Sequence, residues 1–277
     1  MSHPGENIYL ELTRLFNQGR TRAIISSGQA VVLHRLAIMS KDGDWIVREN
    51  EEDLQFVLDV LEQRGARYRF GAPLDARWLA GGWSSHFEFA SGAMRVRCDF
   101  FSRPPRITDE ELAILWKSHD SQTIPYLDIE PLLKVKQTQR EKDYAVIGEL
   151  ARKLSPERQF LHGRSARDLI TNAAQNPGAA RRMEMERPLL GLALSGAREA
   201  LEEALDKERR LLMRADESRL AAYSAASREW QSQWPSFQSS LQGIPLKDAH
   251  SKILQAAEAV LPFYPSWNIK HRSIRNS

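Results

Sequence analysis

The stretch AIISSGQAVVLHRLAIMSKDGDWIV, residues 23–47, decides how this chain is interpreted. It opens with a three-residue apolar run and passes through the small residues SSG at 26–28. The next segment is mostly apolar, and it predicts a buried helix over 29–39. A second apolar run at 44–47 predicts another strand. The order of strand, tight turn, helix and strand indicates a mixed α and β structure.

The residues that follow extend this pattern. Asn50 is placed to cap a helix over EEDLQFVLDVLEQRG (51–65), whose apolar residues recur at helical spacing before a glycine stop. The runs SHFEFA (85–90) and AMRVRCDFF (93–101) flank the turn residues Ser and Gly, so they predict a β-hairpin. We therefore expect a small mixed sheet flanked by helices.

Beyond the hairpin the sequence pattern becomes helical. Thr108 and Glu111 stand at capping-box spacing, and a further helical pattern runs over about 130–153. From Ser155 onward the strand signals disappear and helix starts take their place. The fold class predicted is therefore α+β, with a first domain over 1–154 and an all-α second domain over 155–277.

Composition excludes several classes of protein. The 277 residues are 42% hydrophobic and 27% charged, which permits a buried core and excludes a disordered or collagen-like chain. A single cysteine, Cys98, excludes an internal disulfide and a cysteine-rich zinc site. No apolar stretch reaches the roughly 18 residues of a membrane helix, and the first residues lack a secretion pattern, so a cytoplasmic protein is expected.

Charge is unevenly divided along the chain. The net charge is +3, from 39 basic and 36 acidic residues. Residues 1–154 hold 21 basic and 22 acidic residues, a net charge of −1, whereas 155–277 hold 18 and 14, a net charge of +4. The overall balance does not indicate a nucleic-acid binder, but the second half carries a mild positive excess.

Three carboxylates form the candidate site. Asp42 and Asp44 are two residues apart, a spacing that directs both to one face of a strand unless the turn before the strand intervenes. Asp99 belongs to the polar face of the 93–101 strand. If the hairpin lies beside the Asp44 strand, the three acids converge. A hard divalent ion such as Mg²⁺ (or Mn²⁺) would then relieve their repulsion. Taken singly, each acid also fits a solvated turn, a cap or an ion pair.

Two further elements are candidates for nucleotide binding. Ser27 and Gly28 lie at a strand-to-helix turn, where small residues let the backbone approach a phosphate, although both are also common turn residues. Lys136, Arg140 and Asp143 stand at helical spacings of four and three, so they can share a face. Lys136 either reaches nucleotide phosphates or lies on a solvated helix surface.

In this order the residues resemble a known family. AIISSGQAVVLHRLAIMSKDGDWIV is similar to the opening of nucleotidyltransferase-fold proteins, and VRCDFFSRPP (96–105) is similar to their later strand with a third acid. LLKVKQTQREKDYAVIGEL (132–150) resembles the lysine and aspartate helix of the bacterial abortive-infection branch called AbiEii-like. The resemblance covers about residues 20–153, and the chain departs from the family pattern at Ser27 and Gly43.

This resemblance implies an enzyme that transfers a nucleoside monophosphate from an NTP to an RNA, protein or small-molecule acceptor. It implies that Asp42, Asp44 and Asp99 are catalytic and hold Mg²⁺ or Mn²⁺, and that Ser27, Gly28 and Lys136 bind the nucleotide. It further implies a toxin of a toxin–antitoxin or phage-defence pair, with an antitoxin as partner. The alternative hypothesis is a non-catalytic module of the same fold that contacts a protein or nucleic acid.

Overall fold

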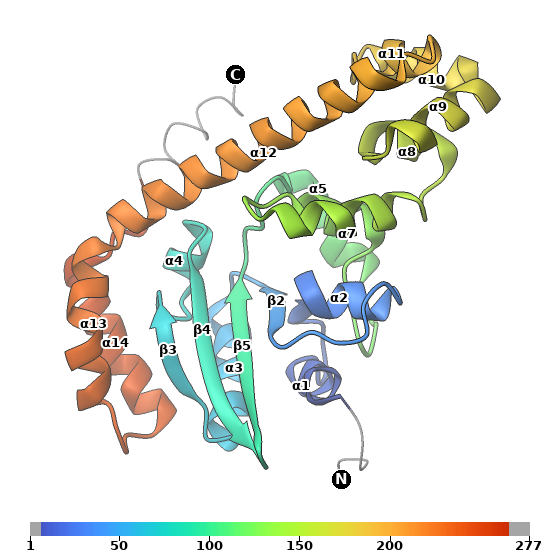
Figure 1. The fold of residues 1–277 in the computed structure, drawn as a ribbon. Coiled ribbons are helices and arrows are strands. Elements are labelled where there is room, and N and C mark those ends of the chain that lie inside the picture. Colours follow the sequence, from blue (N-terminus) through green and yellow to red (C-terminus); the bar gives the residue numbers. More distant parts are fainter. Residues whose placement is uncertain (1–6, 266–277) are drawn as a thin grey trace. The chain divides into compact units, whose positions relative to one another are not determined.

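A computed structural model describes residues 7–265 of the chain (Figure 1). The chain divides into two compact units. The first contains the chain up to Leu127 together with the part from Leu220 onward, and the second is Asp128–Arg219. Within the described residues, no helix is both long enough and apolar enough to cross a membrane.

A five-stranded mixed sheet forms the centre of the first unit. Its strands stand in the order β1-β2-β5-β4-β3. They are β1 (Ala23–Ile25), β2 (Gly43–Val47), β5 (Met94–Phe101), β4 (Ser84–Ser91) and β3 (Arg67–Gly71). β2 and β5 pair in parallel and the other neighbours are antiparallel. The predicted strands and hairpin are confirmed, whereas β3 was not predicted.

One face of the sheet carries the core of this unit. Trp45 of β2 and Phe100 of β5 are register partners, and their rings stack with centroids 5.4 Å apart. Phe16, from helix α1 (Ile8–Phe16), meets both rings edge-on. All three side chains are fully buried. Since side chains alternate along a strand, the neighbours of Trp45 and Phe100 must face the opposite side.

Both helix caps predicted in the first unit are present. The side chain of Asn50 accepts from the N–H of Asp53 at the start of α3 (Glu51–Gln63), and Thr108 and Glu111 form the predicted capping box of α5 (Asp109–Ser118). The other helices of this unit are α2 (Ser27–Leu33), α4 (Ala76–Ala80), α13 (Arg228–Ser240) and α14 (Leu246–Val260).

The helix predicted over 29–39 is shorter than expected. α2 ends at Leu33, and Arg35 takes a left-handed conformation with φ 61°. The N–H groups of Arg35 and Leu36 then donate to the carbonyls of Val32 and Val31. This is a Schellman ending, which usually employs glycine, so the sequence contains no visible stop signal.

Helix α13 covers the free edge of β3. Three of its side chains, spaced four residues apart, donate hydrogen bonds to backbone carbonyls of that strand. Trp230 donates to Gly71, Trp234 donates to Arg69 at 2.7 Å, and Gln238 donates to Tyr68. Backbone acceptors at the sheet edge are therefore satisfied by side chains from more than 150 residues later in the sequence.

The second unit is entirely helical in its described residues. Its helices are α6 (Ile129–Lys136), α7 (Glu141–Ala151), α8 (Pro156–His162), α9 (Ala166–Gln175), α10 (Pro177–Glu184), α11 (Leu190–Leu194) and most of α12 (Arg198–Ala226). The helix expected over 130–153 is two helices, because the chain leaves helical geometry at Gln137 before α7 starts. The division expected after residue 154 falls inside this unit, since α7 packs against both α6 and α8.

A buried ion-pair network organises the second unit. Arg187 is 5% exposed and donates to the carbonyl of Phe160 at 2.8 Å and to that of Gly163 at 2.9 Å. Its guanidinium also pairs with Glu208, which pairs with Arg164 as well. Burial alone would raise the pKa of Glu208, but the hydrogen bonds and charges of the two arginines outweigh it and lower that pKa. The network thus ties α12 to α8.

Candidate functional site

The polar face of the sheet brings two of the three predicted carboxylates together. Asp44 of β2 and Asp99 of β5 are direct register partners on adjacent parallel strands. Residues paired in this way point to the same face, which is here opposite the Trp45–Phe100 face. His86 of β4 is the register partner of Asp99 on its other side. The expectation that the hairpin lies beside the Asp44 strand is confirmed.

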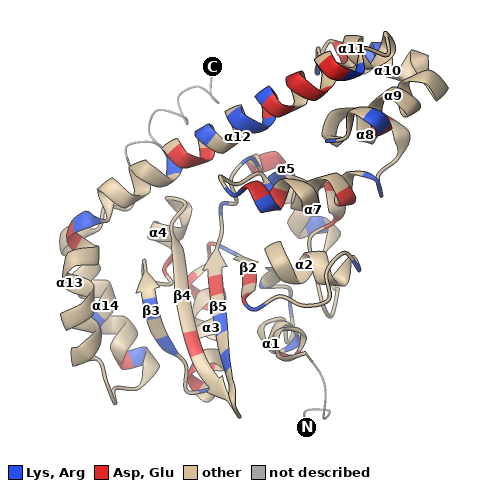
Figure 2. Cartoon of the chain, in the orientation of Figure 1, with Lys and Arg blue, Asp and Glu red and all other residues tan. Residues whose placement is uncertain are grey.

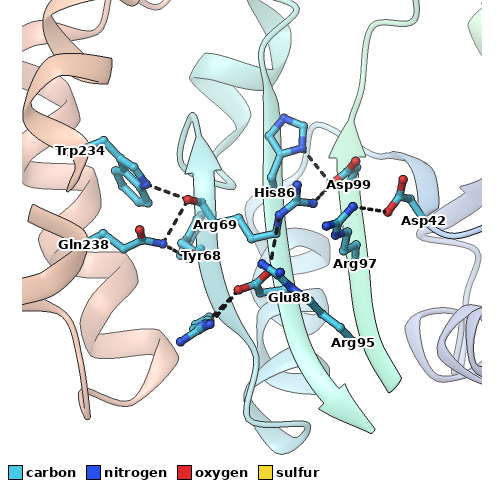
Figure 3. Close-up of polar contacts among 11 residues, drawn as sticks. Asp42, Tyr68, Arg69, His86, Glu88, Arg95, Arg97, Asp99, Trp234 and Gln238 are labelled. Carbon is cyan, nitrogen blue, oxygen red and sulfur yellow. Dashed lines mark hydrogen bonds and ion pairs between the residues drawn. The ribbon is translucent and has the colours of Figure 1, made fainter. Parts of the chain in front are cut away.

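The side chains of His86 and Arg69 contact the carboxylate of Asp99 (Figure 3). Its Oδ1 lies 2.8 Å from Nδ1 of His86 and 3.6 Å from Nη1 of Arg69. The other ring nitrogen of His86 lies 2.9 Å from the hydroxyl of Ser84, and its ring stacks on Phe70. His86 is thereby fixed in a position that orients the Asp99 carboxylate, whose side chain is 20% exposed.

Asp42 lies immediately before β2 and faces a different cation. Its Oδ1 is 3.5 Å from Nη1 of Arg97, and its side chain is 40% exposed. Its backbone carbonyl accepts from the side chains of Gln29 and Ser40, both at 3.3 Å. Asp42 is thus anchored by its backbone, and Arg97 is the counter-ion of its carboxylate (Figure 3).

The charges of the three carboxylates act together on one buried group. Burial raises the pKa of the Cys98 thiol well above its usual range, and Asp99, Asp44 and Asp42 raise it further. Arg69 acts in the opposite direction. Cys98 is the register partner of Gly43, which lies between Asp42 and Asp44, and it directly precedes Asp99 in β5. All three carboxylates therefore act on this one thiol.

Gly43, between the two acids, is required by packing. A side chain there would overlap the rings of Trp45 and Tyr9. Tyr9 donates a 2.6 Å hydrogen bond to the carbonyl of Lys41, and burial raises the pKa of its hydroxyl to about 12. The space that a side chain at position 43 would need is therefore occupied by the rings of Trp45 and Tyr9.

The turn at Ser27 and Gly28 is attached directly to β2. The backbone N–H of Ser26 donates to the carbonyl of Asp44 at 2.8 Å. Ser27 has φ 49°, in the left-handed region that favours glycine. Gly28 packs so closely against Ser40 that a Cβ atom would overlap its hydroxyl. The turn and the acid-bearing strand are thus adjacent, and phosphate binding by Ser27 and Gly28 stays a prediction.

Lys136 belongs to the second unit, at the end of α6. Its side chain is buried, and Nζ lies 3.4 Å from Oδ1 of Asp143. Asp143 also accepts from Thr138 at 2.6 Å and from Arg140 at 2.8 Å. Burial alone would raise the pKa of Asp143, but these partners outweigh it and lower that pKa. Lys136 and Arg140 therefore meet at Asp143 across the break between α6 and α7, not on one face of a single helix as predicted. Lys136 is buried, so the alternative of a solvated helix surface is wrong, and its nucleotide-binding role stays a prediction.

Two of the three predicted carboxylates are placed to contact one divalent ion. Within residues 7–265 no group of three or more His, Cys, Asp or Glu side chains is arranged to hold a metal. Mg²⁺, however, is commonly held by one or two carboxylates together with substrate phosphates. The register pair of Asp44 and Asp99 supplies that donor set, and the carboxylate of Asp42 pairs with Arg97 instead.

Two residues of this site were not predicted from the sequence. His86 and Arg69 both contact Asp99, and no functional role was predicted for either residue. The alternation in SHFEFA, with His86 and Glu88 on one face, was a signal for His86. Arg69 sits at an irregularity in the pairing of β3 with β4, between Tyr68 and Phe70, where alternation no longer indicates direction.

Comparison with known proteins finds two solved structures with weak structural similarity to this chain. No family model and no curated protein matches the sequence. A crystal structure of an H. pylori protein provisionally named as a nucleotidyltransferase is 11% identical, with a TM-score of 0.35, covering 72% of this chain and 94% of its own. That of JHP933 from Helicobacter pylori is 12% identical, with a TM-score of 0.36, covering 73% and 93%. Similarities at this level give no information about the residues of the site.

Proposed function

We propose that this protein is a metal-dependent nucleotidyltransferase. The observation that carries the proposal is the register pair of Asp44 and Asp99 on adjacent parallel strands, with Asp42 just before β2. The turn at Ser27 and Gly28 supports it, because the preceding residue is bonded to the backbone of Asp44. The family resemblance of residues 20–153 supports the same reaction class.

In the proposed reaction an acceptor hydroxyl attacks the α-phosphorus of an NTP. A new P–O bond forms, the bond to the β-phosphate oxygen breaks, and pyrophosphate leaves. Asp99 is the group that takes the acceptor proton, since His86 fixes its carboxylate orientation. Bound Mg²⁺ or Mn²⁺ would supply charge neutralisation at the phosphoryl oxygens, held by Asp44 and Asp99.

The chain's own cations have a defined part in this proposal. Arg69 and Arg97 lie beside Asp99 and Asp42, so their guanidinium groups balance carboxylate charge before the nucleotide arrives. The same groups suit triphosphate oxygens, because guanidinium forks bind phosphate well. Ser27 and Gly28 are proposed to contact phosphate, and nucleotide binding by Lys136 stays a prediction from the sequence.

The proposed biological setting follows the resemblance to the AbiEii-like branch. The acceptor is an RNA, a protein or a small molecule, and the role is that of a toxin in a toxin–antitoxin or phage-defence pair. An antitoxin is then the expected protein partner. This setting rests on the resemblance of residues 132–150.

Labelling tests the proposal directly. The wild-type protein is incubated with each labelled NTP, Mg²⁺ and either total RNA or cell extract. We expect label transfer, and a loss of at least about 100-fold in Asp44→Asn, which removes one charge without changing shape. Asp120→Asn, at an exposed position outside the site, serves as the matched control. Equal labelling by Asp44→Asn and wild type would show that the assigned site is wrong.

A non-catalytic binding module is the second candidate. It is favoured by one observation, namely that protein cations already accompany Asp42 and Asp99. Calorimetric titration with an NTP, with and without Mg²⁺, separates the two candidates. Saturable binding that depends on the metal counts against the non-catalytic module, and metal-independent binding without transfer counts in its favour.

A further inference from the structure

A cavity of about 1130 Å³ lies within the first unit, at the edge of the sheet. One wall is formed by β3 with Glu88 and Arg95 from the neighbouring strands, and the other is formed by the end of α13 and the start of α14. This volume is slightly larger than the roughly 300–1,000 Å³ of typical small-molecule pockets, so a small organic ligand fits inside it. The Asp44 carboxylate does not line it.

The polar wall of the cavity contains three arginines around one glutamate (Figure 3). Oε1 of Glu88 accepts from Nε and Nη2 of Arg67 at 3.1 and 2.9 Å. Oε2 accepts from Nε of Arg95 at 2.7 Å and lies 3.7 Å from Nε of Arg69. Burial alone would raise the pKa of Glu88, but Arg95 and Arg67 outweigh it and lower that pKa.

Basic residues of β3 and β5 flank an acidic residue of β4 in this part of the sheet (Figure 2). The cluster carries more positive charge than its own carboxylate balances. Three guanidinium groups face one buried carboxylate, so the cluster keeps a net charge of +2, of which Asp99 offsets part through Arg69. Each guanidinium has five N–H donors, whereas a carboxylate offers two oxygens. The side chains of Arg67 and Arg95 are 73% and 62% exposed, so their remaining donors are open to a ligand.

The rest of the cavity lining mixes apolar side chains with the polar side chains of Glu62, Gln238, Ser239 and Gln242. Phe70 lines it and is 46% exposed, with its ring stacked on His86 at 4.3 Å between centroids. On the opposite wall stand Ile244, Leu246 and Ile253. A ligand that fits both parts has an anionic group for the arginines and an apolar or aromatic body for Phe70.

We propose that this cavity binds a small organic phosphate. Its phosphate group is held by Arg67 and Arg95, whose planar forks suit phosphate oxygens. Its apolar or aromatic body lies against Phe70 and the α13–α14 wall. This site goes beyond the proposed transferase function, because it does not use Asp42 or Asp44.

Binding of phenyl phosphate to the full chain tests the proposal. We expect saturable binding by calorimetry, at least about tenfold tighter than inorganic phosphate and than benzyl alcohol, which supply only one half of the ligand each. Arg67→Ala and Arg95→Ala should each weaken it at least about fivefold. Each variant leaves two arginines for Glu88, so the buried carboxylate stays paired. Arg198→Ala, an exposed arginine on α12, is the matched control.

A second pair of variants locates the bound molecule. Ser239 lines the cavity and is exposed, whereas its exposed neighbour Ser240 does not line it. Ser239→Trp should abolish phenyl phosphate binding and Ser240→Trp should preserve it. Asp44→Asn should also preserve it, so this result is independent of the transferase test. Absence of saturable binding, or equal binding by Ser239→Trp and wild type, would overturn the proposal.

Discussion

Acidification should destabilise the first unit through His250 of α14. Nδ1 of His250 lies 2.8 Å from the hydroxyl of Tyr68, and the two rings stack with an angle of 4° between their planes. The Tyr68 oxygen already accepts from the N–H of Leu74, so its own hydrogen is directed to Nδ1. That bond requires an unprotonated Nδ1, and burial lowers the pKa of His250 from 6.5 to about 4.

The magnitude follows from linkage. The unfolded chain takes up a proton near pH 6.5 and the folded chain near pH 4, so stability is fully present above pH 6.5 and falls below it. At pH 5 the loss attributable to His250 is about 2 kcal/mol. The tryptophans lie outside residues 128–219, so their fluorescence in urea reports unfolding of the first unit.

The control is His250→Gln, which can still accept from Tyr68 but does not titrate. Its loss of unfolding free energy between pH 7.5 and pH 5 should be smaller than that of wild type by about 2 kcal/mol. Each protein is compared with itself across pH, so any constant cost of the substitution cancels. An identical loss in the two proteins would refute this reasoning.

Two further substitutions test packing. Gly43→Val should cost about 1–3 kcal/mol or more, because the new side chain overlaps Trp45 in a close-packed core; urea unfolding measures this, and an unchanged midpoint would contradict it. Arg187→Ala should cost about 1–3 kcal/mol, because the carbonyls of Phe160 and Gly163 lose their donor, while Glu208 keeps Arg164 as a partner. Circular dichroism, which is dominated by helix, measures the second effect, and unchanged thermal unfolding would contradict it.

Local signals in the sequence predicted much of the first unit. The cap at Asn50, the capping box at Thr108 and the hairpin over 84–101 each depend on residues a few positions apart. Such features can be recognised without knowing the tertiary structure. The convergence of Asp44 with Asp99 was predicted only on the condition that their strands are neighbours, and that condition is met.

What was not predicted depends on distant contacts. β3 has the sequence RYRFG, in which Tyr68 is the buried side chain, so no apolar run marks it as a strand. Its edge is completed by α13, far along the chain. The partners of Asp99 likewise come from β3 and β4, and no spacing within one segment indicates that Arg69 reaches it.

The covering of β3 by α13 has a consequence for how the chain is made. Trp230, Trp234 and Gln238 donate hydrogen bonds to backbone carbonyls of β3. Until residues 228–240 have left the ribosome, these carbonyls can accept hydrogen bonds from any other extended segment. A nascent or proteolysed chain that stops before α13 would therefore expose a template for strand addition between copies, and self-association would follow. Helix α13 therefore protects this edge of the sheet from strand addition, but only after residues 228–240 have been synthesised.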